Sequence, residues 1–201
     1  SIAPYRVFNS TCSGSVDTLA TAIIQATDDG ADIINLSVQY GFFSTPVYSA
    51  TLYAESKGVL MIAAAGNNGG AVQYPARHPQ VMAVAALNIL DEPTWFSQSG
   101  PEVEIAAPGG DADFSTRVLS SWPSNPAAKN RCNNGNGGVI TETLPSGETF
   151  YCALRGTSQA SPAVAGVAAL LMASDPALDA SAVRTILRKT AAPLDADPES
   201  V

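Results

Sequence analysis

Three apolar runs with almost no polar interruption constrain the fold of this chain more than any other feature. They are ADIINLSV at 31–38, VLMIAAAG at 59–66 and VMAVAAL at 81–87, and VEIAAPG at 103–109 is a shorter run of the same kind. A strand with one face in water alternates apolar and polar residues, whereas a strand covered on both faces stays apolar throughout. We therefore expect these runs to be buried strands of one sheet.

Segments with helical periodicity separate or follow these runs. Apolar residues recur at helical spacing after Ser15, a suitable N-cap, and a second helix is expected over 47–57, ending at Gly58. The segment 162–173 is small and apolar on every side, which predicts a buried helix, and 183–187 marks a last amphipathic helix. The pattern predicts an α/β fold with three layers, in which helices flank a mostly parallel sheet.

We expect one domain over residues 1–201, because no internal repeat is visible. YRVFN at 5–9 is a candidate for a further short strand. The segment 121–151 is rich in Pro, Asn and Gly and is predicted to be an inserted surface loop. Residues 193–201 are predicted to be a flexible tail.

The composition argues against two classes of partner. A hydrophobic content of 46% with 14% charged residues predicts a compact globule. Ten basic and eighteen acidic residues give a net charge of -8 without any Lys or Arg cluster, so no nucleic acid is expected as a partner. The longest apolar stretch, 59–65, is too short to span a bilayer, so no membrane is expected either.

Two of the three cysteines flank a Gly- and Asn-rich segment. A disulfide between Cys132 and Cys152 would close a loop of about twenty residues and add roughly 3 kcal/mol of stability. Such a bond predicts a secreted or extracytoplasmic location, whereas the alternative is two free thiols in a cytosolic protein. Cys12 is either a buried thiol or the partner of a cysteine outside this chain.

The stretch LRGTSQASPAVAG at 154–166 places Ser158 at the start of a predicted helix. A helix start presents free backbone N–H groups and the positive end of the dipole, which would stabilise an oxyanion forming beside Ser158. Pro162 is expected in the first turn, where its missing N–H does no harm. The alternative is a serine that only caps the helix.

Asn67 follows the buried run that begins at Met61. In parallel α/β sheets, ligands gather at the carboxyl ends of the strands. An amide at that place can donate a hydrogen bond to a developing oxyanion, an effect worth about 3 to 4 kcal/mol. The alternative is that Asn67 and Asn68 are ordinary turn residues.

Together these segments resemble the subtilisin-like serine proteases. GTSQASPAVAGVAAL is similar to the G-T-S-M-A-S-P-x-V-A-G-x-A-A-L segment of that family, and AAAGNNG to its A-A-G-N-x-G segment. YPARHPQVMAVAAL and FSQSGPEVEIAAPG resemble its Y-P-A and F-S-x-x-G stretches, ADIINLS its cleft strand, and VRTILRKTA its last helix. The resemblance covers most of the chain in the family's order.

The resemblance implies a serine endopeptidase that hydrolyses polypeptides. Ser158 would be the nucleophile and Asn67 the oxyanion donor. The substrate-binding residues that it implies are Ser37, Val38 and Gly41 in the cleft, and Ala64, Ala65 and Gly66 in one wall of the P1 pocket. In relatives, the cleft serine is usually followed by a hydrophobic residue and two glycines. Gln39 and Tyr40 stand at the two glycine positions here, so we do not expect the broad cleft that is usual in the family.

The resemblance implies no cofactor for the chemistry. Subtilisin-like enzymes often hold structural calcium, and the candidate pairs here are Asp111 with Asp113 and Asp195 with Asp197. Isolated pairs of this kind are usually solvated loop acids, so we assign no metal ligand.

The family's catalytic Asp and His motifs do not occur in this sequence. His78, the only histidine, lies beyond the oxyanion asparagine and is expected at the surface rather than as the base. Asp17 is followed by Thr, but no strand precedes it. SIAP at 1–4 resembles the G-V-A-P that follows the family's histidine helix, so we expect a C-terminal portion of a catalytic domain whose partner is the missing N-terminal portion.

Without a base, the Ser158 hydroxyl stays protonated and weakly nucleophilic, so this chain alone is expected to be inactive. A Ser–Lys pair with Lys57, Lys129 or Lys189 has no motif in its support. The alternative function is a non-catalytic binding or scaffold domain of the same fold. Retention of both Ser158 and Asn67 argues against it.

Overall fold

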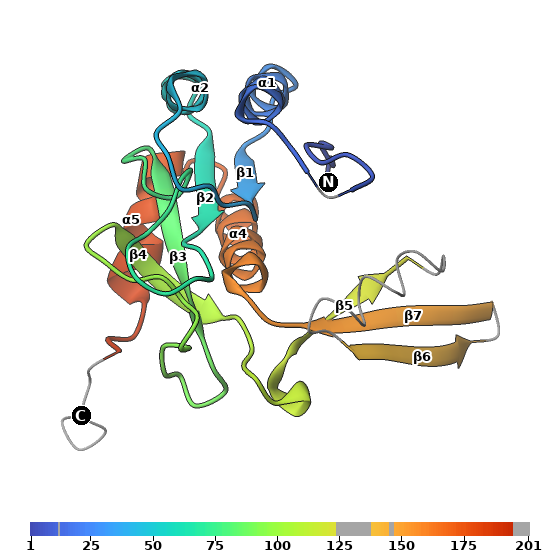
Figure 1. Cartoon of the computed structure of the whole chain (residues 1–201). Coiled ribbons are helices and arrows are strands. Elements are labelled where there is room, and N and C mark those ends of the chain that lie inside the picture. The colour runs from blue at the N-terminus through green and yellow to red at the C-terminus, as the bar shows by residue number, and fades with distance from the viewer. Residues whose placement is uncertain (12, 124–137, 145–146, 195–201) are drawn as a thin grey trace.

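A four-stranded parallel sheet forms the centre of the fold (Figure 1). The structure is a computed structural model and describes residues 1–11, 13–123, 138–144 and 147–194. The strands follow one another across the sheet as β1 (Ile33–Leu36), β2 (Leu60–Ala64), β3 (Val81–Leu87) and β4 (Val103–Pro108).

Helices cover both faces of this sheet, which confirms the three-layer α/β prediction. On one face lie α1 (Val16–Asp28) and α2 (Thr45–Ser56), and on the other lie α4 (Thr157–Ser174) and α5 (Ala180–Thr190). The Ser15 hydroxyl caps α1 by accepting a hydrogen bond from the Thr18 backbone N–H at 3.1 Å, as the sequence predicts. None of the described helices has both the length and the apolar character needed to cross a bilayer.

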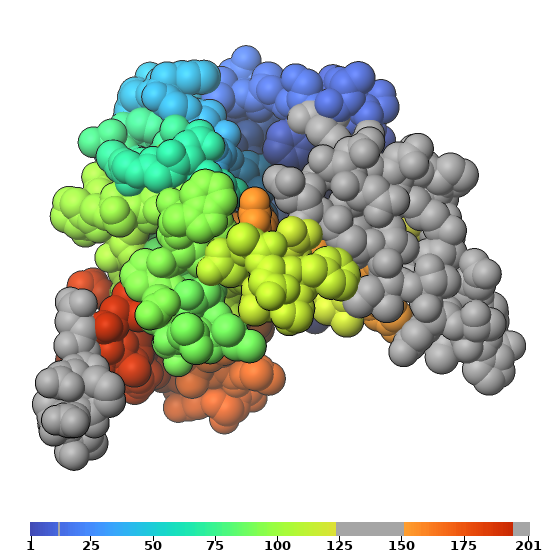
Figure 2. Space-filling view, turned by 60° about the horizontal axis from the view of Figure 1, so that its bottom comes forward, coloured from blue at the N-terminus to red at the C-terminus, as the bar shows by residue number. Residues whose placement is uncertain are grey.

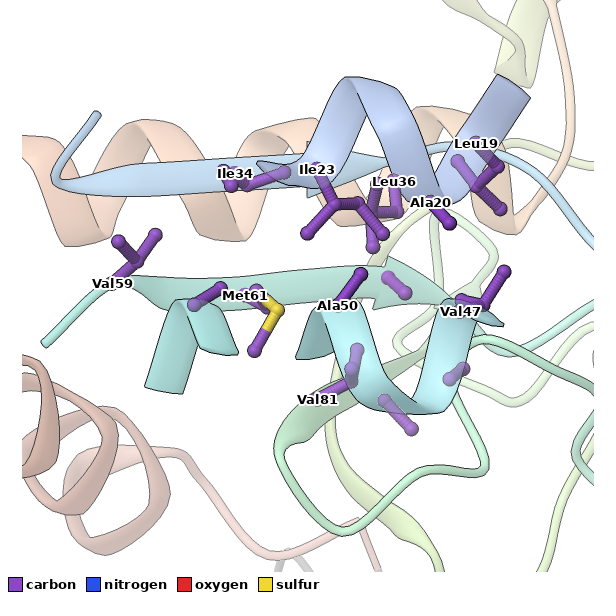
Figure 3. Close-up of a cluster of buried hydrophobic side chains, with 14 of the residues drawn as sticks. Leu19, Ala20, Ile23, Ile34, Leu36, Val47, Ala50, Val59, Met61 and Val81 are labelled. Carbon is purple, nitrogen blue, oxygen red and sulfur yellow. The ribbon is translucent and has the colours of Figure 1, made fainter. Parts of the chain in front are cut away.

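The side chains of each central strand alternate between two hydrophobic cores. In β2, Met61 and Ala63 pack toward α1 and α2, whereas Leu60 and Ile62 pack toward α4 and α5. Figure 3 shows Met61 in the first core, with Ile23 of α1 directed into the same cluster. Because both faces are buried, both sets of positions are apolar, and this explains the absence of alternation in the sequence.

The segment 121–151 contributes to a second, antiparallel sheet. β5 (Val118–Trp122), which follows a short 3-10 turn η1 (Phe114–Thr116), pairs with β7 (Gly147–Leu154), and β6 (Gly138–Leu144) pairs with the other edge of β7. The described backbone of this segment is therefore strand-rich rather than irregular. The second sheet projects away from the α/β body in Figure 1, and β7 leads directly into α4.

The predicted strand at 5–9 does not form. Its backbone joins no sheet, and β1 consequently has a strand neighbour on one side only among the described residues. Tyr5 and Val7 instead pack against the first core, and the Tyr5 hydroxyl donates to the Asp29 carboxylate at 2.5 Å. The apolar side chains that suggested a strand thus cover the side of the first core.

Helix α4 is exposed along one side, so the prediction of an all-round buried helix is wrong. Ala160, Val164 and Ala168 pack on the sheet, but Val167 is 49% exposed and Leu170 is 71% exposed. A helix that is apolar all round normally lies buried. The described part of the chain therefore leaves one apolar side of α4 uncovered.

We predict that replacing Ile62 by Ala lowers the free energy of unfolding by about 2–5 kcal/mol, because Ile62 is fully buried and the change leaves a cavity. The matched control is Ile89→Ala at a side chain that is 72% exposed, where the loss stays within about 0.5 kcal/mol. Urea denaturation measures both. Equal losses at the two sites would contradict the described core.

Candidate active site

The start of α4 meets the carboxyl ends of β1 and β2 at one end of the sheet. Ser37 directly follows β1, Asn67 lies three residues beyond β2, and Ser158 is the second residue of α4. Figure 2 shows orange atoms from the region where β7 leads into α4 at the surface, between green and yellow-green segments. Hydrogen bonds connect all three elements at this place.

The Asn67 side chain joins the end of β2 to the first residue of α4. Its Oδ1 accepts hydrogen bonds from the Thr157 backbone N–H at 2.8 Å and from the Thr157 hydroxyl at 2.9 Å. The same hydroxyl oxygen accepts from the Gly66 N–H at 3.2 Å. These bonds fix the amide so that Oδ1 faces Thr157, and Nδ2, which has no acceptor in the described part of the chain, remains available as a donor.

Ser158 supplies a second unused donor. Its backbone N–H has no acceptor among residues 1–11, 13–123, 138–144 and 147–194, as is usual in the first turn of a helix. Gly156 allows this start, because its φ of +147° is a conformation that other residues rarely adopt. Two free donors therefore lie beside Thr157, where the positive end of the helix dipole favours negative charge.

The Ser158 hydroxyl has no base beside it in the described structure. Its one hydrogen bond there is a long one, to the backbone carbonyl oxygen of Ser37 at 3.5 Å. A carbonyl oxygen does not take up a proton at neutral pH and cannot act as a general base. The described arrangement thus provides a serine hydroxyl and two free N–H donors, but no base that could activate the hydroxyl.

Pro162 lies inside α4 and not in its first turn, so that prediction is wrong. In a regular helix the N–H of residue 162 would donate to the carbonyl of Ser158, but proline has no N–H. The Ser37 hydroxyl donates to this carbonyl instead, at 3.0 Å, and lies 3.1 Å from the Ser161 hydroxyl. Ser37 therefore replaces a missing helix hydrogen bond and fixes the Ser158 backbone to the end of β1.

The predicted substrate-binding residues lie on two segments that leave neighbouring strands. They are Ser37, Val38 and Gly41 after β1, and Ala64, Ala65 and Gly66 at the end of β2. A contact that the sequence did not reveal joins these segments, because the Asn67 backbone N–H donates to the Gln39 side-chain Oε1 at 2.8 Å. The sequence also gives no sign that Thr157, which stands between Gly156 and Ser158 in the serine motif, orients Asn67.

His78 is buried, so the prediction of a surface histidine is wrong. Its ring lies among those of Phe43, Tyr48 and Tyr74, at centroid distances of 5.8, 5.3 and 4.7 Å. Its Nε2 has no hydrogen-bond partner, and burial lowers the pKa of His78 to about 4. The imidazole therefore packs as part of an aromatic cluster and has no contact with Ser158.

Asp111 and Asp113, one of the two candidate calcium-binding pairs, form hydrogen bonds within their own loop. Asp113 accepts hydrogen bonds from the Ser115 N–H and hydroxyl, both at 2.9 Å, and these bonds lower the pKa of Asp113. Asp111 accepts from the next backbone N–H at 2.7 Å. Among the described residues, no three or more His, Cys, Asp or Glu side chains are grouped so that they could hold a metal ion. The second pair, Asp195 and Asp197, lies outside the described residues.

The disulfide stays a prediction. Cys152 lies fully buried in β7, but Cys132 and Cys12 both lie outside the described residues.

We predict that stability falls in acid because of His78. The unfolded chain binds this proton with a pKa near 6.5, whereas the folded protein keeps His78 neutral down to about pH 4. The neutral His78 ring therefore causes no loss of stability above pH 6.5. As the pH falls from 6.5 toward 4, the free energy of unfolding decreases by up to about 3 kcal/mol. His78→Phe places another aromatic ring in the same surroundings and should remove this part of the pH dependence of the free energy of unfolding. Urea unfolding at several pH values measures this dependence. If the free energy of unfolding changed equally with pH in both proteins, the prediction for His78 would be wrong.

We also predict that Ser37→Ala lowers the free energy of unfolding by about 1–3 kcal/mol, because the Ser158 carbonyl loses its partner in a half-buried place. Ser174→Ala is the control, since it removes a similar bond from the exposed end of α4, where water replaces it. Chemical denaturation of both variants checks this. A loss no greater in Ser37→Ala than in the control would contradict the proposed link to Pro162.

Comparison with proteins of known sequence identifies relatives over nearly the whole chain. Subtilisin DY of Bacillus licheniformis is 35% identical over 196 residues, which cover 95% of this chain and 61% of that protein. The halolysin-like extracellular serine protease Nep of Natrialba magadii is 37% identical over 181 residues, covering 89% of this chain and 28% of that protein. The chain thus spans less than two thirds of the length of these relatives.

Solved structures agree with this relationship. A protease from Pseudoalteromonas arctica superposes with a TM-score of 0.76 at 29% identity, over 91% of this chain and 54% of the other. Sphericase gives a TM-score of 0.70 at 30% identity, over 91% of this chain and 57% of its own. The peptidase S8 model, described as the subtilase family, matches residues 1–200. This chain therefore belongs to the subtilase family.

Proposed function

We propose that this chain carries the nucleophile and the oxyanion-binding groups of a serine endopeptidase. The observation that supports this most directly is the pair of hydrogen bonds that Asn67 Oδ1 accepts. The Thr157 backbone N–H donates one at 2.8 Å, and the Thr157 hydroxyl donates the other at 2.9 Å. These bonds leave Asn67 Nδ2 and the Ser158 N–H as two donors beside the serine hydroxyl. Donors that are oriented before the reaction stabilise a developing oxyanion far better than donors that must reorient.

In the proposed reaction, Ser158 Oγ attacks the carbonyl carbon of a peptide bond while a general base takes up its proton. The carbonyl oxygen becomes negatively charged and accepts hydrogen bonds from Asn67 Nδ2 and the Ser158 N–H. The base then returns the proton to the leaving amine, and water hydrolyses the acyl group from Ser158.

We propose that the general base belongs to a part of the catalytic domain beyond these 201 residues. Within the described residues the Ser158 hydroxyl reaches only the Ser37 carbonyl, and this chain spans 61% of subtilisin DY. Val167 and Leu170 of α4 are exposed, and among the described residues β1 has a strand neighbour on one side only. Such a part would cover this apolar surface and these backbone groups. By this proposal the chain alone is inactive.

The proposed substrates are polypeptides, in line with the serine proteases to which this chain is similar. We also propose an extracellular location by analogy, because the relative from Natrialba magadii is described as an extracellular protease.

A fluorophosphonate probe tests the proposal, because it reacts with an activated serine. The chain is labelled alone and after fusion to the Asp- and His-bearing segment of a subtilase, with Ser158→Ala as the control. We expect the fusion to label at Ser158 at least about a thousandfold faster, since loss of the histidine in subtilisin itself lowers kcat about a million-fold. Rapid labelling of the chain alone would overturn the external base. No labelling of either protein would favour a non-catalytic binding domain.

Asn67→Ala in the same fusion isolates the oxyanion donor. We expect the labelling rate to fall about 100- to 1,000-fold, as known for the corresponding loss in subtilisin. Asn68→Ala is the matched control, because Asn68 is the neighbouring exposed asparagine and makes none of these bonds. Equal rates for Asn67→Ala and the unchanged fusion would refute the role of Asn67.

A further inference from the structure

The Gln39 side chain crosses the space between the two segments assigned to the substrate. It leaves the segment after β1, and its Oε1 accepts the hydrogen bond from the Asn67 backbone N–H at 2.8 Å. The same oxygen lies 3.2 Å from the point that a Cβ on Gly66 would occupy. Because Gly66 belongs to the predicted wall of the P1 pocket, Gln39 lies against that wall and fills space in front of it.

Two more glutamine side chains border this space. Gln98 is 2% exposed, and its Oε1 lies 1.4 Å from the position of a Cβ on Gly66. Any side chain at residue 66 would therefore collide with Gln98, which explains a glycine with a φ of +120°. Gln73 lies beside the segment after β1, with its Nε2 3.8 Å from the position of a Cβ on Gly41.

Backbone hydrogen bonds fix the segment that carries Gln39 to the segment around Tyr74. The Tyr40 N–H donates to the Tyr74 carbonyl at 2.9 Å, and the Tyr74 N–H donates back at 3.1 Å. The Gln73 N–H in turn donates to the carbonyl of Ala65, a wall residue, at 3.1 Å. Since these bonds hold the two segments together, the space cannot widen without breaking them. A large group can enter only where Gln39 moves aside.

We propose that Gln39 restricts the P1 side chain of the substrate to that of glycine or alanine. This inference rests on the proposed function, because it uses the assignment of Ala64, Ala65 and Gly66 to the pocket wall. A large P1 side chain must displace Gln39 and leave the Asn67 N–H without its acceptor, which weakens binding about tenfold or more. A small side chain leaves the bond intact. The family pattern that this chain resembles usually has glycine where this chain has Gln39.

Peptide binding tests the restriction without requiring a general base. Acetyl-Ala-Ala-Pro-Ala and acetyl-Ala-Ala-Pro-Phe, which resemble products with a small and a large P1 residue, are titrated into the chain by calorimetry. We expect the alanine peptide to bind at least about tenfold more tightly, and Gln39→Ala to remove this preference. Gln39→Glu keeps the length and the acceptor and should retain the preference.

Gln25→Ala on α1 is the matched control, because its side chain bonds to Asp29 far along the chain from the pocket and should leave the preference unchanged. Hydrogen exchange of the Asn67 amide adds a readout of the contact itself, and it should accelerate in Gln39→Ala but not in Gln25→Ala. Equal peptide preference in the unchanged protein and Gln39→Ala, or no binding of either peptide, overturns the inference. Peptide discrimination without any labelling of Ser158 in the fusion would refute the proposed function alone.

Discussion

The two hydrogen bonds from Thr157 to the Asn67 side-chain oxygen are the interaction on which the candidate site depends. An asparagine amide that rotates freely presents an oxygen as often as a nitrogen, and an oxygen there would repel an oxyanion. Thr157 removes this ambiguity, because its N–H and hydroxyl both require an acceptor. The fold makes the contact possible, since β2 ends next to the first turn of α4. The buried apolar strand thus positions the backbone of Asn67, and one threonine positions its side chain.

A second link between the sheet and α4 arises from Pro162. Because proline has no N–H, the carbonyl of Ser158 lacks its usual hydrogen-bond donor within the helix. The Ser37 hydroxyl at the end of β1 donates to this carbonyl instead, at 3.0 Å. Ser37, for which we propose a place in the substrate cleft, therefore also holds the backbone of Ser158 in place. Gln39, two residues further along, extends this connection to Asn67. The segment after β1 thus combines these structural contacts with the proposed substrate-binding role, so changes there are expected to affect stability and specificity together.

The sequence predicted those parts of the fold that follow from hydrophobic periodicity. The four apolar runs became the four parallel strands, and the helix behind Ser15 starts where the capping residue predicts. The strand at 5–9 did not form, because its apolar side chains cover the first core without pairing to β1. The burial of His78 was not predicted, because its local sequence between two prolines gives no sign of the aromatic rings that enclose it. The contacts of Gln39 and Thr157 join residues far apart in the chain, and no local pattern encodes them.

In the proposed reaction, Asn67 Nδ2 and the Ser158 N–H converge on one oxygen atom. A crystal structure of the protein fused to the base-bearing segment, with a phosphonyl group on Ser158, measures this directly. The account predicts that one phosphonyl oxygen lies about 2.7–3.1 Å from both nitrogens while Asn67 Oδ1 keeps its bonds to Thr157. A phosphonyl oxygen directed into solvent, or an Asn67 amide turned away from Thr157, would contradict it.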